Sequence, residues 1–249
     1  MISSAPRAIR LTAAVALRAD LGLNDCAHVA NVLYFSDKRP SFTDAELFSI
    51  LHLKAAKAMK AVRVKRPERF PHNITTAFLF ASVLADRRVL NVEQAMWEAY
   101  PGECTYCHTA PCSCNQTNRP EERTATKKRR RCTRPRTVRE FQKLSADIYP
   151  PQNDLDTLVH LAEEFAELGA AFHLNGKLTG LSRRGAHAAF KDPFEIEVID
   201  VMSHLFKIAT SQRFDLENAI LDRQISGCHQ CRATKCACTV LDFLDDAHK

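Results

Sequence analysis

The sequence predicts an all-α protein in which two tandem helical units pack as a bundle, each ending in a small four-cysteine metal knuckle. Three observations support this prediction. The 249 residues include only 7 glycines, and Ala and Leu dominate over Val, Ile and Tyr, which favours helices over sheets. Apolar residues recur at helical spacing, and no segment alternates as a strand would. Finally, CTYCHTAPCSC at 104–114 and CHQCRATKCAC at 228–238 share the spacing C-x2-C-x4-C-x-C.

The two cysteine clusters are the ends of a longer repeat. Towards the N-terminus, the similarity continues at an offset of 124 residues, without a gap, back to Asn73 and Glu197. Still further back, 50–62 matches 158–170 at an offset of 108 residues. The offset changes because the second copy has a longer connection between its helices. We therefore divide the chain into a first unit at 1–114, a basic linker at 115–137 and a second unit at 138–249.

Each unit is expected to contain a helix, a loop, a second helix, a short third helix and the cysteine cluster. In the second unit, apolar stripes predict helices at about 155–173 and 194–210. Asp215 is expected to cap a third helix at 216–224, which Gly227 ends.

The linker holds much of the formal net charge of +6. It contains TKKRRRCTRPR and has no apolar periodicity, which is consistent with a solvated tether, a nucleic-acid-binding patch or a nuclear address. The chain has no run of about 18 uncharged apolar residues, so no membrane span is expected. Charged residues interrupt the apolar stretches near the start, which argues against a signal peptide. We therefore expect a reducing, cytoplasmic environment.

Four thiolates within eleven residues can enclose one tetrahedral metal ion. Zn²⁺ in a structural role is the first expectation, an iron–sulfur cluster is the second, and disulfides are the third. Cys26 and Cys132 fit neither cluster and are expected to be free thiols. The predicted ligands are Cys104, Cys107, Cys112 and Cys114 in the first unit, and Cys228, Cys231, Cys236 and Cys238 in the second.

The second unit also carries two acidic motifs on neighbouring helices. Glu163, Glu164 and Glu167 form E-E-x-x-E on the first helix, and Glu197 and Asp200 form E-x-x-D on the next. At 100° per residue, both motifs lie at the same angles from their apolar stripes, so packing would place four carboxylates along one edge. Carboxylates held close together need a cation, and their oxygens suit Mg²⁺ or Mn²⁺. The alternative is that these acids are only the solvated faces of two helices.

Together the motifs resemble the MazG-like all-α nucleoside triphosphate pyrophosphatases, whose signature is E-E-x-x-E, a variable loop and E-x-x-D, followed by an apolar helix and a D-L-E-E-A-like segment. This chain has EEFAE, EVIDVMSHLFKIA and FDLENAILDRQ. The resemblance covers roughly 138–226, with a degenerate echo at roughly 40–103.

The resemblance implies Mg²⁺-dependent hydrolysis of a nucleoside triphosphate, or a related nucleotide, to a monophosphate and pyrophosphate. Glu164, Glu167, Glu197 and Asp200 would hold the metal, and Glu163 would support them. The two units would pack on each other as subunits do in dimeric relatives, and a homodimer is the expected oligomer.

Basic and histidine side chains near the motifs are candidate substrate ligands. His204, like His160, shares the acidic edge and is expected either to contact substrate or a carboxylate, or to be structural. Where the family often has a Lys and an Asn after the third helix, this chain has Arg223 and Gln224. Four cations of the connecting loop are expected to pair with phosphate or, alternatively, to be solvated surface charges: Lys177, Arg183, Arg184 and Lys191.

In the first unit, the alignment leaves no carboxylate at the motif positions. This unit is therefore predicted to be a pseudo-domain that completes the fold. A rival function is a non-catalytic nucleotide- or nucleic-acid-binding protein that uses the cysteine knuckles and the basic linker. The residues aligned with Glu163, Glu164, Glu167, Glu197, Asp200 and His204 are, in that order, Ala55, Ala56, Met59, Asn73, Thr76 and Phe80.

Overall fold

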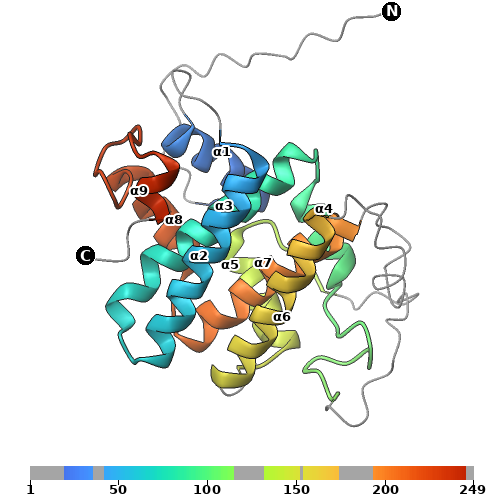
Figure 1. Ribbon diagram of the computed structural model, residues 1–249. Helices are drawn as coiled ribbons and strands as arrows, with labels where there is room; N and C mark the ends of the chain where they lie inside the picture. Colours follow the sequence, from blue (N-terminus) through green and yellow to red (C-terminus); the bar gives the residue numbers. More distant parts are fainter. Residues whose placement is uncertain (1–19, 36–41, 115–131, 152–153, 174–192, 245–249) are drawn as a thin grey trace, which may run out of the picture.

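The computed structural model describes residues 20–35, 42–114, 132–151, 154–173 and 193–244, which form a bundle of helices (Figure 1). These residues contain no strand, so the all-α prediction is confirmed for this part of the chain. None of the described helices combines the length and the hydropathy that crossing a lipid bilayer requires. The elements are α1 (Leu23–Tyr34), α2 (Asp44–Arg63), η1 (Pro67–Arg69), α3 (Phe70–Arg87), α4 (Val92–Ala99), α5 (Val138–Ile148), α6 (Asp154–His173), α7 (Pro193–Ser211), α8 (Leu216–Ser226) and α9 (Val240–Leu244).

The helices of the second unit begin and end close to the predicted positions. The side chain of Asp215 caps α8 by accepting a hydrogen bond from the backbone N–H of Asn218 at 2.9 Å. Gly227 ends α8 with a φ of 78°. A Cβ atom at Gly227 would lie 2.5 Å from the carbonyl oxygen of Ala233, so the turn into the second cysteine cluster needs glycine.

Two helices that the sequence analysis missed, α1 and α5, precede the predicted helices of each unit. In α5, Val138, Phe141 and Ile148 are buried at helical spacing. The side chain of Thr137 accepts a hydrogen bond from the backbone N–H of Glu140 at 3.1 Å, which fixes the start of α5. In the described residues, each unit therefore has four α-helices before its cysteine cluster, the first unit adds the short 3-10 helix η1, and α9 follows the second cluster.

The sequence repeat recurs in the backbone. Val89 and Arg213, which follow α3 and α7, have φ values of 58° and 53° and are 124 residues apart. His108 and Arg232, at corresponding positions in the two cysteine clusters, have φ values of 55° and 60° and the same separation. Left-handed backbone is uncommon outside glycine. Its recurrence at the same positions shows that the corresponding turns have one conformation.

One hydrophobic core runs through both units. Within the units α2 packs on α3 and α6 on α7, and contacts between α3 and α7 join the units. Each unit also packs its fourth α-helix on the other unit. α4 of the first unit packs on α7, and α8 of the second unit packs on α3, on opposite sides of the bundle (Figure 1). Backbone hydrogen bonds also link each cysteine cluster to the other unit: Cys112 donates to Ile148 at 2.7 Å, and Cys236 donates to Leu33 at 2.6 Å. Residues of the first unit therefore reach the acidic motifs of the second.

Candidate functional site

Three of the predicted acidic residues meet between α6 and α7. Carboxylate oxygens of Glu164, Glu197 and Asp200 lie within 4.8 Å of one another, and we call this group the carboxylate cluster. Glu197 is 8% exposed and Asp200 is 3% exposed. Burial, followed by the negative charges of Asp200, Glu167 and Glu197, raises the pKa of the Glu164 carboxyl to about 8. A cation bound between these oxygens would relieve this repulsion.

A tyrosine from the first unit completes the cluster. Tyr100 follows α4, and its hydroxyl donates a hydrogen bond to Oδ1 of Asp200. The ring of Tyr100 also lies edge-on to Tyr149, with centroids 6.0 Å apart. Sequence reasoning missed Tyr100 because its contact with Asp200 depends on how the two units pack. The acidic motifs of the second unit do not indicate which residues of the first unit lie beside them.

His204 and Lys207 lie on the same face of α7 as Asp200. Nδ1 of His204 is 3.0 Å from the backbone oxygen of Asp200, and Nε2 is 3.2 Å from Nζ of Lys207. Burial and the charge of Lys207 lower the pKa of His204 well below its ordinary value. The neutral ring can donate from Nδ1 to the carbonyl and accept at Nε2 from Lys207. His204 therefore positions the ammonium group of Lys207. Lys207 lies seven residues after Asp200, which is two helical turns, so the sequence spacing could have predicted that both residues share one face of the helix.

The structure does not bring the other predicted site residues into the cluster. Glu163 is 60% exposed and lies 2.9 Å from Nδ1 of His160 on the solvent side of α6. Glu167 is also exposed, although its charge raises the pKa of Glu164. Arg223 lines a separate cavity, whose walls include none of the three carboxylates. The remaining predicted phosphate ligands lie outside the described residues: Lys177, Arg183, Arg184 and Lys191.

The structure corrects the alignment of the first helix pair. α2 and α6 are both 20 residues long and both begin with aspartate, 110 residues apart. Their buried positions match at this offset, as Leu51 with Leu161 and Ala55 with Phe165 show. The predicted offset of 108 residues is therefore wrong by two, because a chance match of histidines fixed it. At the corrected offset, Lys54 replaces Ala56 as the counterpart of Glu164, and Lys57 replaces Met59 as the counterpart of Glu167.

In the first unit, aromatic and basic side chains occupy the position that corresponds to the carboxylate cluster. Lys54 is fully buried, with Nζ 5.8 Å from the ring centre of Phe243. The ring of Phe80 lies 5.5 Å from that of Phe243 and 5.2 Å from that of Tyr34. Thr76, the counterpart of Asp200, donates its hydroxyl hydrogen bond to the carbonyl of its own helix at His72. Among the described residues, no group of carboxylates at this position could hold a divalent cation, and Phe243 of α9 packs into the space.

The cysteines of each cluster have the spacing of a single-ion site. Sγ of Cys104 lies 3.9 Å from that of Cys114, and Sγ of Cys228 lies 3.9 Å from that of Cys238. A tetrahedral Zn²⁺ with Zn–S bonds of about 2.3 Å separates its sulfurs by about 3.8 Å. All ten cysteines are free thiols, as predicted for Cys26 and Cys132, so the disulfide alternative is not realised.

The thiols of the second cluster resist joint ionisation. A hydrogen bond with Cys236, together with backbone N–H groups and against the effect of burial, lowers the pKa of Cys228 to about 5. Burial, and then the charges of Cys228 and Cys231, raise the pKa of Cys238 to about 12. A metal ion would stabilise all four thiolates together. Both clusters could therefore hold a metal such as zinc.

Searches against protein-family models, curated proteins and solved structures returned no match. In the described residues, the fold and the site define an all-α protein with two four-cysteine clusters and one cluster of buried carboxylates.

In the absence of magnesium, the free energy of unfolding is expected to fall as the pH rises from about 5 to 8. The folded state keeps the proton of Glu164 up to a pKa of about 8, whereas the unfolded chain releases it near the ordinary value of 4.5. The stability that protonated Glu164 contributes below pH 4.5 is therefore lost as the pH approaches 8, by up to a few kcal/mol. Urea unfolding at several pH values measures this loss. Glu164→Gln should flatten the profile, and an unchanged profile in that variant would contradict the assignment.

Proposed function

We propose that the protein is a magnesium-dependent nucleotide pyrophosphohydrolase of the MazG-like class. It converts a nucleoside triphosphate, or a related nucleotide, to a monophosphate and pyrophosphate. The observation that carries this proposal is the convergence of Glu164, Glu197 and Asp200 between α6 and α7. These are three of the four acids that the family signature assigns to the metal, and they come from both of its motifs.

The donor set fits a hard divalent cation. All the ligand atoms are carboxylate oxygens, which Mg²⁺ and Mn²⁺ prefer. Oε2 of Glu164 is buried and accepts no hydrogen bond from the described residues, so it is available as a ligand. Bound magnesium would polarise phosphoryl oxygens and lower the pKa of a bound water. Glu167, one turn along α6, would add negative charge to the same site.

The surrounding residues would orient the ligands and the substrate. Tyr100 donates a hydrogen bond to Oδ1 of Asp200 and so fixes the orientation of the carboxylate. The other oxygen, Oδ2, would then be held ready to bind the metal ion. Lys207 brings positive charge close enough to lower the pKa of Glu164, and a phosphate oxygen would attract the same ammonium group. The burial of Glu197 and Asp200 limits water around the reacting phosphorus, which strengthens these electrostatic interactions.

The cysteine clusters would be structural zinc sites. Each belongs to a segment that connects one unit to the first helix of the other. They would therefore hold α4 and α8 in place, and with α4 the position of Tyr100. The homodimer expected from the resemblance remains a prediction, which light scattering of the purified protein tests.

Tyr100→Phe is expected to weaken the apparent affinity for Mg²⁺ by roughly 10-fold, because Asp200 loses the donor that orients it. The turnover number at saturating Mg²⁺ should change less, since Tyr100 positions a ligand and does not contact the reacting atoms. The measurement is pyrophosphate release as a function of Mg²⁺ concentration. Tyr34→Phe, which removes a tyrosine hydroxyl from the first unit, is the control and should keep the wild-type Mg²⁺ dependence. Equal Mg²⁺ dependence in wild type and Tyr100→Phe would refute the positioning role.

The proposed function is tested by a pyrophosphate-release screen over the ordinary and modified nucleoside triphosphates, with and without Mg²⁺. Pyrophosphate and a nucleoside monophosphate in equal amounts, only with Mg²⁺ or Mn²⁺, are the expected products. Release of orthophosphate alone would show a different reaction. Absence of turnover, combined with salt-sensitive binding of single-stranded nucleic acid, would favour the rival binding function.

A further inference from the structure

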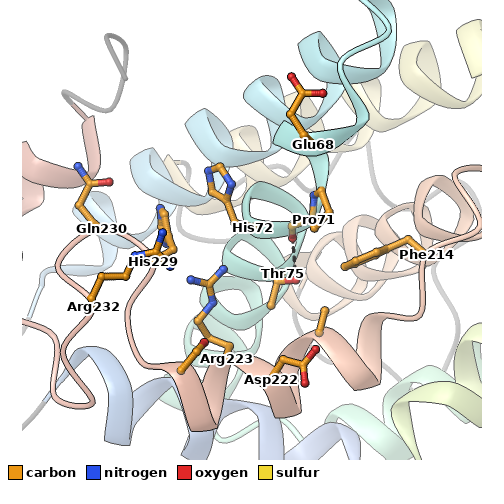
Figure 2. Close-up of a pocket in the computed structure, with 12 residues that line it drawn as sticks. Glu68, Pro71, His72, Thr75, Phe214, Asp222, Arg223, His229, Gln230 and Arg232 are labelled. Carbon is orange, nitrogen blue, oxygen red and sulfur yellow. Dashed lines mark hydrogen bonds between the residues drawn. The ribbon is translucent and has the colours of Figure 1, made fainter.

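The cavity that Arg223 lines lies between α3, α8 and the cysteine cluster of the second unit. Its volume is about 630 Å³, which is within the range of small-molecule sites. His72 and Thr75 of α3 line one wall, and Arg223 of α8 lines another (Figure 2). This cavity is independent of the carboxylate cluster, because none of the three acids contributes to it.

The guanidinium of Arg223 is the central feature of this cavity. Arg223 is only 9% exposed. Within the part of the chain that the structure describes, its side chain makes no hydrogen bond and no ion pair. Figure 2 shows it pointing from α8 into the cavity, whereas the neighbouring carboxylate of Asp222 points away from it. A guanidinium that faces a cavity without a hydrogen-bonded counter-ion attracts an anion, so the cavity favours a negatively charged ligand.

Further donors surround the same end of the cavity. The rings of His72 and His229 stack with centroids 4.5 Å apart, and both side chains line the cavity next to Arg223. Arg232 lies at the exposed edge of the cavity on the cysteine cluster. A planar guanidinium with neighbouring imidazole and guanidinium donors matches the tetrahedral oxygens of phosphate.

The other end of the cavity is of a different character. The ring of Phe214 lies at this end and, with Pro71, provides an apolar wall (Figure 2). Asp222 and Glu68 are exposed at this end and can accept hydrogen bonds. A ligand that fills the cavity would therefore carry a phosphate at one end and a flat apolar group with amino donors at the other.

We propose that this cavity binds a small phosphate monoester with a flat base-like portion, as in a nucleoside monophosphate, and that Arg223 is its phosphate anchor. Binding depends on the guanidinium and needs no divalent cation. It therefore does not rest on catalysis at the carboxylate cluster.

Isothermal titration calorimetry of the full chain in magnesium-free buffer tests the proposal, with three probes: inorganic phosphate, ribose 5-phosphate and adenosine or uridine 5′-monophosphate. We expect saturable binding of at least one nucleoside monophosphate, with at least 10-fold weaker binding of the two smaller probes. If inorganic phosphate bound as tightly as the nucleoside monophosphate, the proposal that the cavity recognises a base-like group would be wrong. Tighter binding of a short single-stranded oligonucleotide than of the mononucleotide would overturn the small-molecule assignment.

Arg223→Met keeps the bulk of the side chain and removes its charge. Nucleotide affinity should fall at least 30-fold, and the melting temperature without ligand should hold or rise because an uncompensated buried charge is gone. Arg63→Met, at an exposed position on α2, should change neither quantity. Asp200→Asn should retain full binding, which separates this site from the proposed metal site. Wild-type affinity in Arg223→Met would overturn the proposal.

The exposed position of Arg232 allows a second test with little risk to the fold. Arg232→Gln should weaken binding of the nucleoside monophosphate about 3- to 10-fold. If Arg223→Met does not fold, Arg232→Gln alone decides the question. Wild-type affinity of Arg232→Gln for the nucleoside monophosphate would then overturn the proposal.

Discussion

Asp200→Asn is expected to reduce Mg²⁺-dependent pyrophosphate release by roughly 10³-fold, because it removes a charged ligand from the proposed metal site while keeping the shape of the side chain. The asparagine oxygen can still accept the hydrogen bond that Tyr100 donates to Asp200. Thermal stability without Mg²⁺ should hold or rise, because a source of the repulsion that raises the pKa of Glu164 is removed. Steady-state turnover against Mg²⁺ concentration, with a parallel melting curve, measures both effects.

Comparison of further variants makes this prediction specific. Glu197→Gln should have a similar effect, and the double variant should cost much less than the sum, because one metal site is already broken. Glu167→Gln should cost less than Glu164→Gln, since Glu167 lies outside the cluster. Thr76→Ala changes the residue of the first unit that corresponds to Asp200 and should leave turnover unchanged. Near-normal turnover in Asp200→Asn would leave the three acids without a catalytic role.

Local signals in the sequence predicted the second unit well. Apolar stripes gave α6 and α7, and the cap at Asp215 and the glycine at Gly227 gave α8, because periodicity and capping depend on neighbouring residues only. The same kind of signal was present for α5. Thr137 and Glu140 stand at the spacing of a helix start, and the apolar residues that follow lie on one face.

Features that depend on the packing of distant segments were not accessible from the sequence. Tyr100 is 100 residues away from Asp200 and belongs to the other unit. The correct counterpart of Glu164 also emerged only from burial, because residue identities favoured an alignment that placed Ala56 there. With Lys54 at that position, the first unit has a basic side chain where the second has an acidic one. The first unit has therefore lost a metal ligand and gained a group that would repel a cation when protonated, which is a more severe change than the alanine that the alignment indicated.

The position of α9 explains why the second cysteine cluster matters beyond its own unit. Phe243 is fully buried against Phe80 and Tyr34 of the first unit, and it comes only five residues after Cys238. Cys236 is itself hydrogen-bonded to the end of α1. Loss of this cluster would therefore open the core of both units.

Cys228→Ser is accordingly expected to lower the zinc content from about two equivalents per chain to one and to destabilise the whole protein by several kcal/mol. Cys228 is fully buried, and its replacement removes one of four thiolates from a site that would stabilise the folded state directly. Cys107→Ser should also remove one zinc equivalent but cost less stability, because the thiols of the first cluster, apart from Cys104, are only half-buried. Elemental analysis and urea unfolding measure the two quantities.

The control for both variants is Cys132→Ser, which removes a thiol outside the clusters and should keep two zinc equivalents and the wild-type unfolding curve. Iron in the elemental analysis, with visible absorption that falls by about half in Cys228→Ser, would show that the clusters hold iron and sulfur in place of zinc. All four sulfurs of each cluster lie within 4.8 Å of one another, which argues against that outcome, because an iron–sulfur cluster divides its thiolates among different irons and spreads the set further apart. If Cys228→Ser kept two metal equivalents and unfolded like the wild type, the second cluster would hold no metal, and Phe243 would keep its place through hydrophobic packing alone.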